Sequence, residues 1–128
     1  MAAAQLSGLR ILVLEDEALI AFDVEQLCRD NGAEDIVVAR TLRDAQSLSQ
    51  PFDVAIIDVM LDGEPTLDFA KGLEANGVPF VFATGYDRID EIFSGFPGVE
   101  LISKPYSGTD LVEAVAASVA QPDPSADG

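Results

Sequence analysis

Histidine and tryptophan are absent from this sequence, and cysteine occurs only once among its 128 residues. Without histidine, imidazole can neither bind zinc nor act as a general acid or base, so metal or acid–base chemistry must use carboxylates. The single Cys28 cannot form an internal disulfide, which fits a reducing compartment. Its position on the apolar face of a predicted helix indicates a small buried hydrophobe rather than a reactive thiol.

Basic residues are also scarce, because 7 lysines and arginines stand against 23 acidic residues and give a formal net charge of −16. Such a charge repels nucleic acid and anionic membranes, so we expect direct binding to neither. No apolar run approaches the roughly 20 residues of a membrane span. Residues 1–8 lack the basic region and the apolar core of a secretory signal, so we expect a soluble, cytoplasmic protein.

Short apolar runs alternate with amphipathic stretches, which is typical of strand–helix units around a parallel sheet. The length and the 48% apolar fraction suit one domain with a real core. We expect an α/β fold with a doubly wound, five-stranded parallel sheet of order 2-1-3-4-5. The predicted domain spans residues 9–120, between an N-terminal tail at 1–8 and a polar, disordered C-terminal tail at 121–128.

Local signals set the predicted ends of several helices. Asn31 and Gly32 end the first helix, Thr41 caps the second, and Pro65 suits the first turn of the third. Glycines and prolines interrupt the stretch at 86–97, where we expect a short, mobile fourth helix. The strands are predicted at 11–14, 36–39, 54–57, 80–83 and 99–102, and the last helix at about 107–120.

Polar side chains follow four of the five apolar runs. Glu15 and Asp16 follow the first strand, Asp58 the third, Thr84 the fourth, and Lys104 the fifth. In the predicted strand order the first and third strands are neighbours, so the acidic pair should face Asp58 at the edge of the sheet where ligands bind.

Three carboxylates brought together repel one another unless a cation lies among them, and Mg²⁺ prefers such oxygen ligands. Asp16 and Asp58 are the best direct ligands, whereas the longer Glu15 is expected to act through a bound water. Phosphoryl transfer needs an attacking oxygen and positive charge on the transferred group. Asp58 can supply the oxygen, Mg²⁺ and Lys104 the charge, and Thr84 a hydroxyl hydrogen bond.

These elements occur together in sequence motifs that resemble the receiver domains of bacterial two-component response regulators. The match covers about residues 9–120 and implies a flavodoxin-like receiver fold. A further stretch, 82–86, resembles the Phe-Ala-Thr-Gly-Tyr motif of the "FAT GUY" subfamily, whose members are often single-domain proteins. The receiver motifs lie at residues 12–17, 56–61, 83–85 and 103–106.

The resemblance implies a phosphoacceptor signalling protein rather than an enzyme. Asp58 would take a phosphoryl group from a sensor histidine kinase or a phosphotransfer protein. Thr84 and Lys104 would contact that group, and the Lys104–Pro105 bond is commonly cis in the family. Because the chain has no room for an output domain, we expect it to bind a downstream protein partner or to relay or drain phosphate.

The resemblance also implies a metal site. Glu15, Asp16 and Asp58, together with the main-chain carbonyl of Met60, would bind Mg²⁺. Met60 stands where many relatives have a polar residue, so its apolar side chain is expected to alter the access of hydrolytic water.

Leu101 replaces the aromatic residue that rotates in many receivers when the threonine moves. The usual switch cannot operate in this form. We therefore expect signalling through Thr84, Lys104 and reordering of Tyr86–Phe96, with Tyr86 or Tyr106 as a secondary participant.

Two rival functions remain open at this point. A phosphatase of the haloacid dehalogenase type also uses a strand-end aspartate, a threonine, a lysine and Mg²⁺. Such enzymes need a second aspartate two residues after the nucleophile, where this chain has Met60; the next acid is Asp62. A pseudo-receiver that binds partners without taking phosphate is the other alternative.

Overall fold

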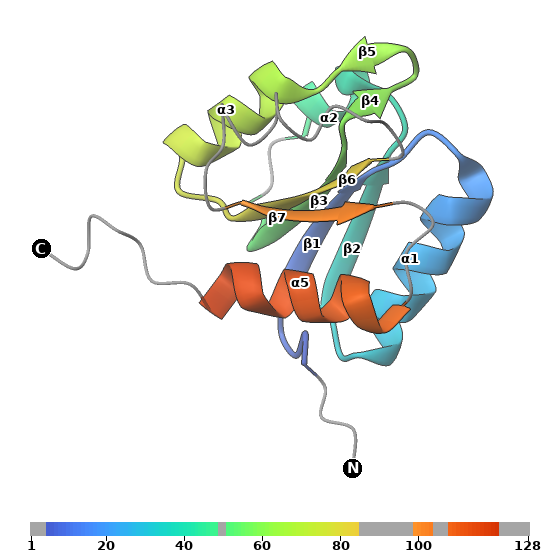
Figure 1. Cartoon of the computed structure of the whole chain (residues 1–128), viewed down its shortest axis with the longest axis vertical. Helices are drawn as coiled ribbons and strands as arrows, with labels where there is room; N and C mark the ends of the chain where they lie inside the picture. Colours follow the sequence, from blue (N-terminus) through green and yellow to red (C-terminus); the bar gives the residue numbers. More distant parts are fainter. Residues whose placement is uncertain (1–4, 49–50, 85–98, 104–107, 121–128) are drawn as a thin grey trace, which may run out of the picture.

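The computed structural model describes residues 5–48, 51–84, 99–103 and 108–120 of the chain. Strands and helices alternate along most of this length (Figure 1). The elements are β1 (Arg10–Leu14), α1 (Ala18–Asp30), β2 (Asp35–Ala39), α2 (Leu42–Gln46), β3 (Val54–Asp58), β4 (Met60–Leu61), β5 (Glu64–Pro65), α3 (Leu67–Ala75), β6 (Phe80–Thr84), β7 (Glu100–Ser103) and α5 (Gly108–Ala120).

Five parallel strands form the main sheet in the order β2-β1-β3-β6-β7. Numbered along the sheet-forming strands alone, this is the predicted order 2-1-3-4-5, so the predicted α/β architecture is confirmed. The register pairs Leu14 with Ile57 and Asp58 with Ala83. Strands β1, β3 and β6 therefore end at the same edge of the sheet.

Helices cover both faces of the sheet, with α1 and α5 on one face and α2 and α3 on the other (Figure 1). Side chains alternate between the faces along each strand, so Ile11 and Val13 pack towards α1 and α5 while Leu12 and Leu14 pack towards α2 and α3. Burying one such side chain stabilises the fold by about 1.5–3 kcal/mol. Two apolar cores thus hold the strands in place.

Helix ends follow the predicted local signals in two cases. The hydroxyl oxygen of Thr41 accepts a hydrogen bond from the Asp44 N–H at 3.1 Å and caps the short α2. Asn31 forms the C-cap of α1, and Gly32 follows it with a φ of 93°. These residues satisfy backbone groups that a helix leaves without internal partners.

The start of the third helix differs from the prediction, because Pro65 belongs to a strand rather than to a first helical turn. Met60 pairs with Pro65 and Leu61 with Glu64 in a two-stranded antiparallel hairpin. Asp62 and Gly63 form its turn with φ values of 51° and 81°. A two-residue turn with both φ angles positive favours Asp-Gly. Helix α3 accordingly begins at Leu67.

The predicted fourth helix at 86–97, including Tyr86–Phe96, and the tail at 121–128 lie outside the described residues. Within the described ranges, no helix is long and apolar enough to cross a bilayer. Cys28 is fully buried in the core between the sheet, α1 and α5, as its helical position predicted. Burial raises the pKa of its thiol from 9.0 to about 12.

Candidate metal centre

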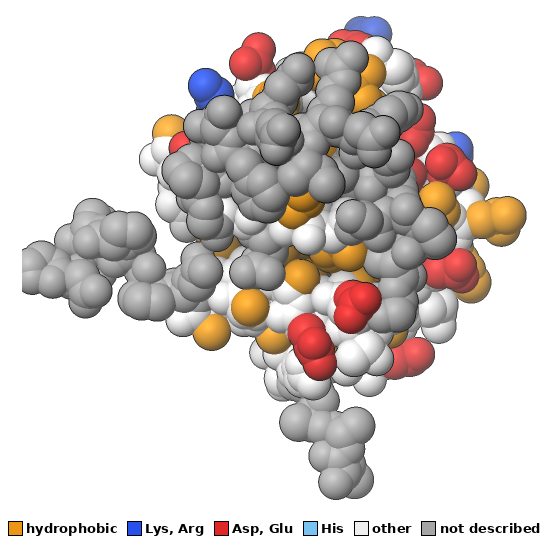
Figure 2. All heavy atoms as spheres, in the orientation of Figure 1, with side chains coloured by type: hydrophobic (Ala, Val, Ile, Leu, Met, Phe, Trp, Pro, Cys, Tyr) orange, Lys and Arg blue, Asp and Glu red, His pale blue; other side chains and the backbone are white. Residues whose placement is uncertain are grey.

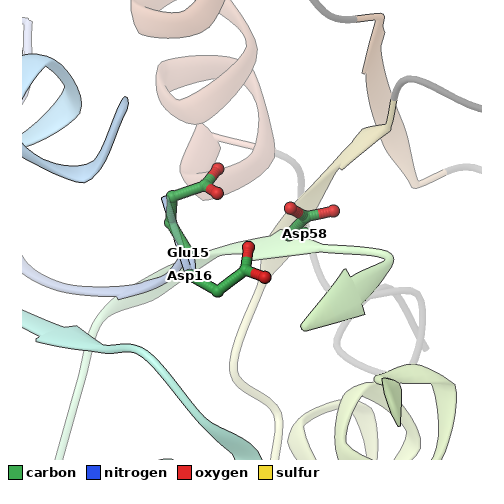
Figure 3. A group of neighbouring side chains, drawn as sticks. All are labelled: Glu15, Asp16 and Asp58. Atoms are coloured by element: carbon green, nitrogen blue, oxygen red, sulfur yellow. The ribbon is translucent and has the colours of Figure 1, made fainter. Parts of the chain in front are cut away.

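The parallel pairing of β1 and β3 brings three acidic residues together at the carboxyl ends of these strands. Leu14 is paired with Ile57, so the next residues along the chain, Glu15 and Asp58, face each other across the sheet edge. Asp16 follows at the start of the loop to α1. Figure 3 shows the side chains of Glu15, Asp16 and Asp58 gathered at this edge of the sheet.

One carboxylate oxygen of each residue, Glu15, Asp16 and Asp58, lies within 4.8 Å of the other two. Glu15 and Asp58 are only 3% and 6% exposed, whereas Asp16 is half-buried. Two like charges about 4 Å apart repel by about 4 kcal/mol at an effective dielectric constant of about 20. The cluster therefore favours a cation that can lie among the three oxygens.

Backbone N–H groups hold each of the three carboxylates. The Glu17 N–H donates to Glu15 Oε2 at 3.1 Å, and the Met60 N–H donates to Asp58 Oδ1 at 3.3 Å. The Asp62 N–H, at the turn of the β4–β5 hairpin, donates to Asp16 Oδ2 at 3.0 Å. Such bonds restrict the rotation of the carboxylates and fix the direction in which each one points. The hairpin that the sequence interpretation missed thus contributes directly to the site.

Thr66 is a buried residue of this region that sequence reasoning also missed. Its hydroxyl donates to the main-chain oxygen of Asp58 at 2.7 Å and lies 3.0 Å from that of Val59. Its N–H also donates to the Val59 oxygen, at 3.0 Å. These contacts anchor the end of β3, and with it Asp58. A threonine just before an apolar helical pattern was the available signal, but it indicates a helix cap rather than this contact.

The donor set suits a hard divalent cation, because all three groups are carboxylates and ions such as Mg²⁺ prefer oxygen ligands. Glu15, Asp16 and Asp58 would hold such an ion. Met60 begins β4 two residues after Asp58. Its carbonyl as a fourth ligand remains a prediction.

The remaining predicted site residues are placed in part. Thr84 ends β6 one residue beyond Ala83, the partner of Asp58, although its side chain lies outside the described part. Ser103 pairs with Thr84 across β6 and β7. Lys104, Pro105 and Tyr106 follow outside the described residues. Leu101 lies in β7, half-buried against the core beneath α2 and α3.

No family model matches the sequence. The transcriptional regulatory protein PdtaR of Mycobacterium tuberculosis is 28% identical over 117 residues, which cover 88% of this chain and 57% of that protein. The uncharacterized transcriptional regulatory protein YbdJ of Bacillus subtilis is 26% identical over 110 residues, covering 84% of this chain and 49% of that one. The chain thus spans about half the length of these curated relatives.

Solved structures share the fold. The receiver domain of the Erythrobacter litoralis PhyR response regulator matches with a TM-score of 0.77 and 24% identity, over 91% of this chain and 96% of that one. The response regulator PhyR from Brucella abortus matches with a TM-score of 0.73 and 29% identity, over 93% of this chain and 50% of that one. By fold and by sequence, this chain therefore resembles the receiver domains of response regulators, as its motifs predicted.

Proposed function

We propose that this chain is a phosphoacceptor receiver, in which Asp58 takes a phosphoryl group from a phosphohistidine of a sensor histidine kinase or a phosphotransfer protein. One observation carries the proposal. Asp58 is a nearly buried aspartate at the end of the central strand, with a carboxylate oxygen within 4.8 Å of both Glu15 and Asp16. The likeness to response-regulator receivers supports the same role.

The reaction would form a mixed anhydride on Asp58. One carboxylate oxygen attacks phosphorus, the phosphorus–nitrogen bond of the phosphohistidine breaks, and the departing imidazole takes up a proton. The Met60 N–H at Asp58 Oδ1 holds the carboxylate in one orientation, and Thr66 holds the main chain behind it. Bound Mg²⁺ would neutralise charge that develops on the phosphoryl oxygens. Thr84 and Lys104 are proposed to contact the same group from β6 and from the residue after β7.

The phosphodonor is proposed to approach over α1. This helix begins at Ala18, two residues after Asp16, and carries the large apolar side chains that are most exposed among the described residues, Leu19 at 81% and Phe22 at 59%. An apolar surface beside the acceptor suits a protein partner better than a nucleic acid. Figure 2 shows acidic side chains at the upper, right and lower edges of the view, and the formal net charge is −16. Because negative charge repels phosphate backbones, we propose no nucleic-acid partner for this chain.

The output is proposed to be protein binding, or the relay or draining of phosphate, rather than catalytic turnover. Because residues 82–86 resemble the Phe-Ala-Thr-Gly-Tyr motif, a relationship to the FAT GUY regulators is part of the proposal. A haloacid-dehalogenase-like phosphatase is disfavoured because Met60 occupies the acid–base position. Asp62 cannot substitute readily, since it is exposed in a hairpin turn and its own N–H is bound to Asp16.

Phosphotransfer with a matched control tests the proposal. The protein is incubated with Mg²⁺ and either a labelled histidine kinase or acetyl phosphate, and acid-labile phosphate is measured. We expect Asp58→Asn to lose labelling essentially completely, because an amide cannot act as the nucleophile. Asp62→Asn, which removes a nearby carboxylate and keeps the turn, should label normally.

Full labelling of Asp58→Asn would overturn the assignment of the acceptor. A wild-type protein that takes no phosphate from either donor would indicate a pseudo-receiver. Continuous phosphate release over many turnovers from small phosphate esters would indicate a phosphatase.

A further inference from the structure

Asp16 is held by hydrogen bonds on two sides, from two different loops. On its side chain, Oδ2 accepts the Asp62 N–H of the β4–β5 hairpin at 3.0 Å. On its main chain, the carbonyl oxygen accepts a hydrogen bond from Arg40 Nη2 at 2.8 Å. Arg40 directly follows the last residue of β2 and lies 24 positions away in sequence. The acidic loop, residues 15–17 between β1 and α1, is therefore held by residues that lie 24 and 46 positions away in the sequence.

The end of β2 holds both members of the acidic pair. The Glu15 N–H donates to the Ala39 oxygen at 3.2 Å. The residues that follow these two, Asp16 and Arg40, form the second hydrogen bond. Two consecutive residues of the acidic loop are thus tied to two consecutive residues at the end of β2. This arrangement fixes the direction in which the chain leaves β1.

Arg40 does not neutralise the acidic cluster through an ion pair. Among the described residues, its guanidinium lies within ion-pair distance of no carboxylate, and it donates instead to the main-chain oxygen of Asp16. A positive charge beside a cation site opposes cation binding through Coulomb repulsion. A purely electrostatic role for Arg40 would therefore weaken the affinity for Mg²⁺, whereas a geometric role would strengthen it.

We propose that Arg40 is a positioning residue of the metal centre. By holding the main chain of Asp16, it keeps this carboxylate at the distance from Asp58 and Glu15 at which one divalent cation can be bound directly by both aspartates and through a water by Glu15. Residues that orient metal ligands from outside the ligand set commonly contribute substantially to metal affinity. The inference deepens the proposed function and rests on the use of this cluster for Mg²⁺.

Calorimetric titration of Mg²⁺ into the phosphate-free protein, at constant ionic strength, tests the role of Arg40 without any phosphotransfer. We expect Arg40→Ala to weaken binding about tenfold, the lower end of the range for residues that orient ligands. Arg40→Lys retains a donor and should recover most of the affinity. Arg43→Ala is the matched control, because it removes the same charge from an exposed position on α2. It should leave the affinity unchanged or slightly increase it.

The sign of the change decides the outcome. Arg40→Ala that binds Mg²⁺ as tightly as the wild type, or more tightly, would overturn the inference, as would Arg40→Lys that binds no better than Arg40→Ala. Thermal unfolding without Mg²⁺ identifies a variant that is merely misfolded, and Arg40→Gln then replaces Arg40→Ala in the comparison.

The proposed function fails separately. A wild-type protein that binds Mg²⁺ but accepts no phosphate would refute phosphoacceptance and leave the role of Arg40 intact. A wild-type protein that binds no Mg²⁺ would overturn the role of Arg40.

Discussion

Cys28 illustrates at the scale of one residue how burial changes chemistry. The side chain is fully enclosed between α1, α5 and the sheet, and desolvation of the thiolate raises the pKa of the thiol to about 12. At neutral pH the thiol in the folded protein is almost entirely protonated and shielded from reagents. The residue therefore acts as a small apolar side chain in the core.

The stability of the protein should fall at alkaline pH because of this thiol. Below pH 9 it is protonated in both the folded and the unfolded chain. Between pH 9.0 and about 12 the unfolded chain loses the proton while the folded chain keeps it. The free energy of unfolding then falls by at most about 1.4 kcal/mol per pH unit.

Urea unfolding across this pH range measures the effect, with Cys28→Ala as the reference. The alanine variant loses a constant packing contribution at every pH but lacks the thiol titration. Parallel pH profiles for the two proteins would contradict the assignment, since all other titrating groups are common to both.

The individual site residues could be predicted from sequence to different degrees. Glu15, Asp16 and Asp58 follow apolar runs, and this local pattern suffices to place them at strand ends. The contacts of Thr66 and Arg40 could not be predicted, because they join residues 8 and 24 positions apart through the paths of loops. No periodicity in the sequence specifies those paths.

At the scale of secondary-structure elements, the β4–β5 hairpin is the feature that the sequence interpretation overlooked. The Asp62-Gly63 pair is a strong signal for a two-residue hairpin turn. Pro65 was instead assigned to a helix, because proline suits a first helical turn as well as the edge of a hairpin. The long elements were predictable because their apolar patterns extend over several residues, whereas each strand of the hairpin has only two.

Two glycine substitutions should change the stability in opposite directions. Gly63 has a φ of 81°, and a Cβ built there would meet no atom within 4 Å, so the cost of Gly63→Ala is backbone strain alone. We expect a loss of about 1–2 kcal/mol. Gly72 lies within α3 and is equally unhindered, so Gly72→Ala should stabilise the protein by about 0.5–1 kcal/mol.

Chemical denaturation of both variants and of the wild type provides the comparison. The two substitutions add the same methyl group, which makes each the control for the other. Equal effects of the same sign would show that the positive φ at Gly63 is not maintained in solution.

At the scale of the whole molecule, the net charge of −16 and the acidic cluster both make stability depend on cations. Mg²⁺ should raise the unfolding temperature by binding only the folded state. A concentration of one hundred times the Kd corresponds to about 2.7 kcal/mol of added stability. Because Asp16 is expected to ligate directly and Glu15 through water, Asp16→Asn should reduce this gain more than Glu15→Gln.

Thermal scans at a series of Mg²⁺ concentrations, each matched by NaCl of equal ionic strength, measure the specific part of the gain. Sodium chloride controls for general screening of the negative surface. Equal responses to the two salts, or an Asp16→Asn variant with the full Mg²⁺ response, would contradict the site.

Strands β1 and β3 are apolar on both faces, so a slip of one residue would replace one apolar set with another and expose nothing polar. Hydrophobicity alone therefore tolerates a misaligned sheet. The polar residues at the two ends of these strands oppose such a slip. At one end, Asp53 accepts the Arg10 N–H and donates its own N–H to the Arg10 oxygen.

At the other end, a slip would move Glu15 or Asp58 into the interior of the sheet, away from the backbone N–H groups that bind these carboxylates. A buried charge that loses its partners costs several kcal/mol. The carboxylates that are proposed to bind Mg²⁺ and to accept the phosphoryl group would thus also disfavour a misaligned sheet. A descendant of this chain that lost its acidic residues would lose the proposed metal site together with part of what aligns its strands.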